Sequence, residues 1–395
     1  MKKILFIHHA VGWGGAPIAM IKLIKALDTS KYDVKVLLIK DSIVAQKLEE
    51  NGIKYSIASS AFYKKYYFGF IHSEAGYYKW YQFYYLLKSS IFWLLSRYYF
   101  AKKELANHDY DIVHLNSSIM SDWLAPAKAK GEVVIHIREP FRKGKYDLLH
   151  YLFVNQMRKY ANHIIAISED NARRIGLPEK TEVVYDYSEL STIAPNEESY
   201  YSKSVLYLGG SAEIKGFYDI VESLKYLDKD IKVYFGGGYE MFQSKSSLKR
   251  FFKFIIASDS KAKEAIQIMR ESPNAIEIGL VYDVPQYLNK VCCLVSPFSK
   301  PHFSLPVIEA FACRKSAIVT DIEGADEVVK HKINGLIVSK GNPKKLADAM
   351  RYICNNGSLA QEMGRNGFKD AQEKFDIINM DKIASIYDRL LKLKK

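Results

Sequence analysis

Short apolar runs rich in β-branched residues alternate with helical patterns along the whole chain of 395 residues. This alternation predicts parallel β-sheets covered by helices. In the first half the expected strands are 4–8, 34–39, 53–57, 112–115, 133–137, 164–167 and 183–185. In the second half they are 205–208, 231–235, 276–278, 292–295, 317–319 and 336–338. The pattern therefore predicts two doubly wound α/β units in tandem.

A polar stretch without periodicity separates the two halves and contains Pro195. It predicts a linker, which we place at 191–203, between a first domain at 1–190 and a second at 204–372. Two domains also suit the length, and the 48% hydrophobic and 26% charged residues are typical of a globular protein. In open α/β sheets ligands bind beyond the carboxyl ends of the strands, so the residues that follow each strand are the candidates for a site.

A glycine-rich loop follows the first strand and leads into a helix. Gly14 and Gly15 precede Pro17, which suits a first helical turn. Backbone N–H groups at such a helix start favour a phosphate. A tight turn between strand and helix explains the glycines equally well, and the loop is neither G-x-G-x-x-G nor a Walker motif.

The second half opens in a similar way, with Gly209 and Gly210 after a strand and Lys215 placed to reach a phosphate. Further on, Glu309 lies among apolar residues at the start of a predicted helix. A carboxylate in apolar surroundings needs a partner. A ribose diol is one candidate, and a structural salt bridge or a helix cap is the alternative.

His136 ends an apolar strand and is followed by Arg138 and Glu139. A lone histidine at a strand end is more often a hydrogen-bonded core residue than a catalyst, and Arg138 and Glu139 could simply pair. Asp109 and Asp111 precede a strand, so we interpret them as a surface strand entry. We find no metal site with credible ligand spacing, no G-x-S-x-G elbow and no C-x-x-C pair.

The formal net charge is +13, and part of it is concentrated in residues 62–103, where seven basic residues face one acid, Glu74. Ten of the 29 tyrosines also lie there. From residue 83 to 98 apolar side chains recur at spacings of three and four, which predicts an amphipathic helix too charged to span a bilayer. Such a helix can dock on an anionic membrane surface, or it can be an ordinary helix whose apolar face packs in the core. Aromatic and basic residues also make stacking platforms, but no recognisable module accompanies them, so we expect no nucleic-acid partner.

The four cysteines lack C-x-x-C spacing, which indicates a reducing compartment. The N-terminus enters a strand pattern after three residues, with no apolar run long enough for a signal peptide. We therefore expect a cytoplasmic protein, bound peripherally to the inner face of the cell membrane if the segment 62–103 docks there.

Several motifs together resemble those of the GT-B glycosyltransferases of family 4, over nearly the whole chain and most closely from about 204 to 350. They are Gly14-Gly15-Ala16, Leu208-Gly209-Gly210 with Lys215-Gly216, and the segments 274–281, 296–298, 303–310, 324–329, 334–338 and 341–343. The resemblance implies a GT-B fold, in which two tandem Rossmann-like domains border a cleft. It also implies that residues 373–395 form a helix that packs back on the first domain.

The resemblance assigns roles to individual residues. Glu309 would bind the ribose of a nucleotide-sugar, Lys215 its diphosphate, and the backbone at Gly14 and Gly15 would face the donor phosphates. His136 would lie beside the transferred sugar. The remaining implied donor contacts are Gly209, Gly210, Val281, Phe303, Ser304 and Leu305.

Two positions depart from the family pattern. The first glutamate of its E-x7-E signature falls on Pro301, and an arginine usually paired with the lysine falls on Gly210. Arg138 or Lys300 could compensate for the missing cation. No metal or cofactor is expected besides the donor, and a UDP-sugar is preferred by resemblance alone.

We expect a retaining glycosyltransferase that moves a sugar from a nucleotide diphosphate to a growing, lipid-linked glycan. No pair of carboxylates in glycosidase-like positions is apparent, which disfavours hydrolysis as the main reaction. The alternative is a GT-B-shaped nucleotide-sugar or glycan binding protein in which the two departures mark weakened catalysis.

Overall fold

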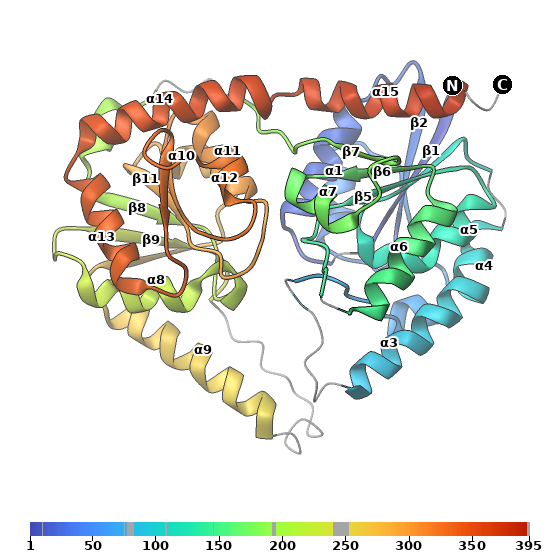
Figure 1. Cartoon of the computed structure of the whole chain (residues 1–395), viewed down its shortest axis with the longest axis horizontal. Helices are drawn as coiled ribbons and strands as arrows, with labels where there is room; N and C mark the ends of the chain where they lie inside the picture. The colour runs from blue at the N-terminus through green and yellow to red at the C-terminus, as the bar shows by residue number, and fades with distance from the viewer. Residues whose placement is uncertain are drawn as a thin grey trace. The chain divides into compact units, whose positions relative to one another are not determined.

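The computed structural model describes residues 1–9, 11–74, 76, 83–106, 109–144, 146–191, 195–239 and 253–392, with only the backbone described at 253–259. The chain forms two compact units (Figure 1). Unit 1 comprises Met1–Tyr187 and Ile377–Lys395, and unit 2 comprises Ser188–Asp376. Each unit is built around its own parallel sheet.

Within the described residues, unit 1 contains a seven-stranded parallel sheet in the order β3-β2-β1-β4-β5-β6-β7. The strands are β1 (Lys2–His8), β2 (Tyr32–Leu38), β3 (Tyr55–Ile57), β4 (Ile112–Leu115), β5 (Glu132–Ile137), β6 (His163–Ala166) and β7 (Thr181–Val183). Because β1 is followed by β2 on one side and flanked by β4 on the other, the connections diverge between β1 and β4. That point is where an open α/β sheet offers a binding crevice.

Helices cover both faces of this sheet. Successive residues of β1 point to opposite faces and are apolar on both, so each face needs a covering layer. Leu5 and Ile7 pack into one core, and Ile4 and Phe6 pack into another. The first core is closed by α3 (Phe83–Leu95), α4 (Ala101–Leu105), α5 (Leu124–Lys128), α6 (Leu148–Tyr160) and α7 (Glu169–Ile175). The second is closed by α1 (Gly15–Ala26), α2 (Ile43–Glu50) and α15 (Ile378–Lys392).

The final helix, α15, belongs to unit 1, although the chain reaches it only after completing unit 2. The Tyr387 hydroxyl lies 2.7 Å from His114 Nδ1 on β4, and the Tyr32 hydroxyl donates to Asp388 over 2.5 Å. Ile383, Ile386 and Tyr387 are fully buried, so this helix supplies part of the core of unit 1.

In the part of unit 2 that the structure describes, six parallel strands follow the order β10-β9-β8-β11-β12-β13. They are β8 (Ser204–Tyr207), β9 (Lys232–Gly236), β10 (Ala275–Gly279), β11 (Cys293–Ser296), β12 (Ser316–Thr320) and β13 (Gly335–Val338). The helices are α8 (Phe217–Ser223), α9 (Lys253–Glu271), α10 (Val284–Leu288), α11 (Leu305–Ala312), α12 (Ala325–Val328), α13 (Pro343–Cys354) and α14 (Gly357–Lys374). Here the connections diverge between β8 and β11.

Each strand expected from the sequence overlaps a strand of the structure, and the predicted fold of two Rossmann-like parallel-sheet domains is confirmed. The segment 191–203 differs from the expected linker. It contains the 3-10 helix η5 (Glu197–Tyr201), and Tyr200 is 1% exposed in the core of unit 2. The polar composition of the segment gave no indication that Tyr200 is buried. None of the helices within the described ranges combines the length and the hydropathy needed to cross a bilayer.

The buried histidines of unit 1 should make its stability depend on pH. Burial, and next the charge of Arg138, hold the pKa of His114 and His136 well below 6.5, and burial does the same for the pKa of His8. The unfolded chain therefore binds more protons than the folded one, so stability is full above about pH 6.5 and falls as the pH drops. The expected loss is roughly 1.4 kcal/mol per pH unit for each such histidine.

Asp122 acts in the opposite direction, because burial raises its pKa to about 7, but it is a single group. Urea unfolding followed at pH 5, 6, 7 and 8 checks the slope. The His136→Gln variant, which cannot take up a proton, should show a shallower slope by about one proton. A chain that becomes more stable from pH 7 to pH 5 contradicts this account.

Candidate functional site

The candidate site of unit 2 lies at the carboxyl ends of β8 and β11, where the connections of its sheet diverge. The loop after β8 runs through Gly209 and Gly210 to the short 3-10 helix η6 (Glu213–Lys215). The loop after β11 runs from Pro297 to Ser304, where α11 begins. The two loops are joined to each other, because the Ser299 N–H donates to the Ile214 carbonyl over 2.9 Å.

The glycine pair after β8 is required by the fold. A Cβ on Gly209 would lie 2.0 Å from the Tyr207 hydroxyl, and Gly210 has a left-handed φ of +57°. The Gly210 N–H donates to the Gly236 carbonyl at the end of β9 over 3.1 Å. These contacts indicate a tight turn in which both glycines have a structural role.

Lys215 ends η6 and is half-buried. Burial lowers the pKa of its ammonium group. Within the described residues, no hydrogen bond or ion pair reaches its Nζ atom. A cation that has lost part of its water and has gained no protein anion is suited to bind an anionic ligand.

Gly216 fixes the position of Lys215 relative to the loop after β11. Its φ is +76°, and a Cβ added there would lie 1.8 Å from the Pro297 carbonyl oxygen. Only glycine permits this approach of two backbones. The placement of the Lys215 side chain therefore depends on a contact between segments that lie 81 positions apart in sequence.

The loop after β11 is braced by side chains on its own turn. The Ser296 and Ser304 hydroxyls are 2.9 Å apart, and the rings of Phe298 and His302 stack at 4.4 Å with an interplanar angle of 17°. Ser304 and Leu305 are buried at the start of α11.

The remaining predicted residues of unit 2 are spread around this edge. Glu309 lies half-buried in α11, and Phe303 lies edge-on to Phe375 at 6.1 Å. Val281 follows β10, and its methyl group lies near Gly236. Lys300 is exposed. The structure thus places Gly209, Gly210, Lys215 and the start of α11 at one sheet edge, whereas the ligand contacts assigned to all these residues stay predictions.

In unit 1 the glycine loop leads into α1 at the carboxyl end of β1. Gly14 is the residue before the helix, and no side chain caps the helix there. A Cβ on Gly14 would meet no atom within 4 Å, so the space beside it is open. The Asn116 amide, which follows β4, lies 3.4 Å from the Ala16 carbonyl and 3.0 Å from His8 Nδ1. Phosphate contact by Gly14 and Gly15 stays a prediction.

His136 occupies a core position and has no surface on which a sugar could bind. It lies within β5, is 1% exposed, and its ring meets that of His114 at 5.5 Å. Burial, and then the charges of Arg138 and His114, keep its pKa low. The arrangement fits the alternative interpretation of the sequence, a buried strand histidine, and gives no support to the predicted sugar contact.

Arg138 is also unsuited to replace the missing family arginine. It is 6% exposed, it forms an ion pair with Asp186 at 2.5 Å, and its Nε donates to the Asn116 side-chain oxygen over 2.9 Å. Its charge is therefore already used inside unit 1. It does not pair with Glu139, whose carboxylate instead accepts hydrogen bonds from the Ser117 and Ser118 hydroxyls.

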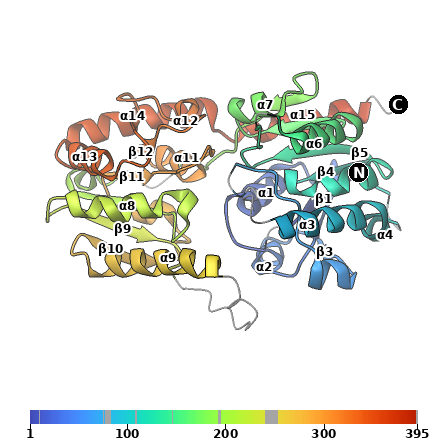
Figure 2. The same ribbon diagram turned by 60° about the horizontal axis from the view of Figure 1, so that its bottom comes forward.

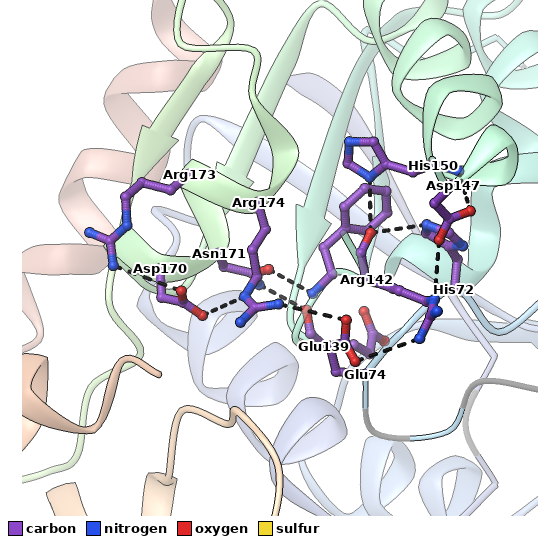
Figure 3. A network of polar contacts seen from close by, with 11 residues as sticks. His72, Glu74, Glu139, Arg142, Asp147, His150, Asp170, Asn171, Arg173 and Arg174 are labelled. Atoms are coloured by element: carbon purple, nitrogen blue, oxygen red, sulfur yellow. Dashed lines mark hydrogen bonds and ion pairs between the residues drawn. The ribbon is translucent and has the colours of Figure 1, made fainter. Parts of the chain in front are cut away.

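The sequence analysis missed a polar network around the loop that follows β5 (Figure 3). Arg142 pairs with Asp147 at 3.1 Å and with Glu74 at 3.7 Å, and Arg174 reaches Glu74 at 3.8 Å. Asn171 on α7 donates to the Glu139 carbonyl over 2.8 Å. The position of some of these residues could have indicated a site, since Asn116, Ser117 and Glu139 lie within two positions of a strand end.

Comparison with known proteins identifies the class to which this architecture belongs. Residues 13–186 match the profile of Glycosyltransferase Family 4, and residues 195–370 match that of Glycosyl transferases group 1. The structure of Anabaena Alr3699/HepE in complex with UDP and glucose has a TM-score of 0.73 and 18% identity, and the match covers 98% of this chain and 100% of that one.

Two curated relatives match parts of the chain. The capsular polysaccharide biosynthesis glycosyltransferase CapM of Staphylococcus aureus is 26% identical over 192 residues, which are 47% of this chain and 46% of CapM. The N,N'-diacetylbacillosaminyl-diphospho-undecaprenol alpha-1,3-N-acetylgalactosaminyltransferase of Campylobacter jejuni is 26% identical over 158 residues, 40% of this chain and 42% of that enzyme. The match thus spans less than half of each relative. The two profiles together cover most of the chain, and it belongs to the GT-B glycosyltransferases of family 4.

The approach of Gly216 to Pro297 can be tested by substitution. Gly216→Ala should destabilise unit 2 by at least about 2 kcal/mol, because the methyl group meets a backbone oxygen and φ is positive. Gly341→Ala is the matched control in the same unit. Its φ is +65° with no atom within 4 Å, so we expect a loss of only about 1 kcal/mol. Urea unfolding measures both variants, and equal losses would show that the close approach is absent.

Proposed function

We propose that this chain transfers a sugar, with retention of anomeric configuration, from a UDP-sugar to a growing lipid-linked glycan. The observation that carries the proposal is Lys215, a half-buried cation without a protein partner in the described chain, at the diverging point of the unit 2 sheet. A nucleoside diphosphate would be the anionic partner that this ammonium group lacks.

The reaction places negative charge where Lys215 can stabilise it. The bond between the anomeric carbon and the phosphate oxygen breaks, and the acceptor hydroxyl oxygen forms the new bond to that carbon. The acceptor's proton passes to the departing phosphate, so we assign no general base. The ammonium of Lys215 stabilises the leaving diphosphate in a partly dehydrated site, where its charge acts more strongly than in water.

Glu309 would bind the ribose of the donor. Its side chain is half-buried on α11, a helix that begins next to the loop after β11. The relatives support the same ligand class, since HepE was crystallised with UDP and glucose and the Campylobacter enzyme is named for a diphospho-undecaprenol substrate.

Removal of Lys215 should abolish most turnover. We expect Lys215→Ala to lower the rate of UDP release from the preferred UDP-sugar by about 10²-fold, comparable to the loss of a preorganised oxyanion donor. Lys225→Ala is the control, because Lys225 lies on the surface of the same unit and pairs with Glu222 at 2.8 Å. It should keep the wild-type rate within twofold.

A thermal-shift panel of UDP, GDP, ADP and their sugars selects the donor first, since a ligand at 100 times its Kd adds about 2.7 kcal/mol of stability. A Lys215→Ala enzyme with wild-type rate contradicts the assigned role. Tight UDP binding by the wild type without turnover of any UDP-sugar in the presence of lipid-linked acceptors would favour the binding protein instead.

The helix α3 supports the membrane part of the proposal, because many of its apolar side chains are exposed although Leu86, Phe92 and Trp93 pack against the core. Leu87, Ile91 and Leu94 are 48%, 46% and 48% exposed, whereas Ser89 and Ser96 are fully buried. The Ser96 hydroxyl lies 2.7 Å from that of Tyr63 in the core. An ordinary amphipathic helix has the opposite orientation, with serines outside. The exposure of these residues supports the docking interpretation over a core-packed apolar face.

The helix η3 (Ser96–Phe100) joins α3 to α4 in one helical path (Figure 2). The exposed apolar surface of α3 continues into η3 through Tyr98 and Tyr99. We define the docking face by its exposed members: Phe83, Tyr84, Tyr85, Leu87, Ile91, Leu94, Leu95, Tyr98 and Tyr99. Exposed lysines flank it in sequence at positions 64, 65, 102 and 103. Apolar and tyrosine side chains beside cations suit an anionic bilayer surface. The neighbouring Tyr77, Tyr78 and Trp80 lie outside the described residues.

Polar substitutions on this face should release the protein from membranes. The pair Leu87→Gln and Leu94→Gln should weaken binding to phosphatidylserine-containing vesicles at low salt by about tenfold or more, since each leucine loses on the order of 1 kcal/mol of apolar burial. The control pair is Ile333→Gln and Tyr352→Gln in unit 2, whose side chains are 52% and 48% exposed.

Vesicle cosedimentation measures both variants against the wild type. A wild type that stays in the supernatant, or two pairs with equal losses, contradicts membrane docking. A docking-face pair that dissociates a dimer of the wild type, with no vesicle effect, would identify the face as a contact between two copies of the chain.

A further inference from the structure

His302 is a half-buried polar residue that the reaction described above does not use. It follows Pro301 in the loop between β11 and α11, and its ring is held flat on Phe298. The loop around it is fixed at both ends by the hydroxyl pair of Ser296 and Ser304 and by the Ser299 N–H bond to Ile214. The ring therefore has a defined position before any ligand binds.

The imidazole has no partner for either nitrogen among the residues that the structure describes. Nδ1 is buried without a hydrogen bond, and no protein contact satisfies Nε2. A buried polar atom left unsatisfied costs free energy, and such atoms at a loop edge are often completed by a ligand. This observation is independent of the one that singled out Lys215.

Lys215 lies close enough to affect the charge of the histidine. Burial, and then the positive charge of Lys215, lower the pKa of His302 to about 4. At neutral pH the ring is uncharged, so it can both donate and accept a hydrogen bond. A site with an ammonium group beside a neutral imidazole has two distinct binding elements, one for negative charge and one for neutral hydroxyl groups.

We propose that His302 hydrogen-bonds a hydroxyl group of the sugar carried by the donor, and so positions that sugar beside the diphosphate held by Lys215. The inference rests on the proposed function and adds a specificity-determining contact to it. A neutral donor and acceptor matches a sugar hydroxyl, whereas a second phosphate contact would be better served by a cation. Pro301, the preceding residue, offers no polar side chain for this purpose.

Binding of UDP and of UDP-sugars by His302 variants tests the assignment. His302→Phe retains a ring to stack on Phe298 but removes both nitrogens, and His302→Gln restores a donor and an acceptor. Isothermal titration with UDP, UDP-glucose and UDP-N-acetylglucosamine gives the ratio of Kd values for UDP and for the better of the two sugars. We expect His302→Phe to lower this ratio by about five- to tenfold, the loss of one hydrogen bond, with the Kd of UDP unchanged within twofold.

His302→Gln should recover at least half of the lost ratio on a logarithmic scale. A His302→Phe protein that keeps the wild-type ratio overturns the proposal, and so does one that loses affinity for UDP and for the UDP-sugar equally, which would indicate a phosphate contact. Failure of the underlying function has another signature: the wild type would not bind UDP, or Lys215→Ala would bind it as well as the wild type.

Discussion

A single contact between two backbones fixes the cation on which the site of unit 2 depends. Gly216 packs against the Pro297 carbonyl, and the next residues, Ser299 and Ile214, join the same two loops by a hydrogen bond. Lys215 is thereby held where part of its hydration is lost and no carboxylate reaches it within the described chain. The glycines at 209 and 210 have a related structural role, since they let the first loop turn tightly after β8. The loops after β8 and β11 therefore form one structural unit rather than two separate motifs.

The sequence predicted the fold well because each strand and helix follows from a local pattern of apolar and polar residues. Strands buried on both faces require runs of apolar, often β-branched residues, and Val133–Ile135 is such a run. The roles of the polar residues at the strand ends depended on distant partners instead. His136 faces His114, which in turn contacts Tyr387 of α15, and Arg138 pairs with Asp186, which lies 48 positions later. No local pattern reports such pairings, so the sugar contact of His136 and the compensating role of Arg138 stay predictions, although both side chains are buried in unit 1.

The helix α3 shows again that a local sequence pattern does not report tertiary contacts. Its periodicity predicted an amphipathic helix, but the period does not say which face meets the core. That choice is made by tertiary contacts: the Ser96 hydroxyl is satisfied by Tyr63, and the indole N–H of Trp93 donates to the Ser121 hydroxyl over 3.0 Å. With its polar groups satisfied inside, the helix leaves Leu87, Leu94 and Leu95 and its two tyrosines exposed. An exposed apolar surface of this extent is unusual in a protein that only contacts water.

The residues that we assign to function reduce the stability of the molecule in the absence of a ligand. A half-buried ammonium without an anion and a buried imidazole nitrogen without a partner both destabilise unit 2, and an exposed row of leucines gains nothing for unit 1 in water. Selection for stability alone would replace each of them with little change of fold. Each of these features is consistent with local rules that are broken where a ligand or a surface completes the structure. A donor bound to Lys215 and His302 would return the lost free energy in unit 2, so occupancy by the donor and stability of this unit are thermodynamically linked.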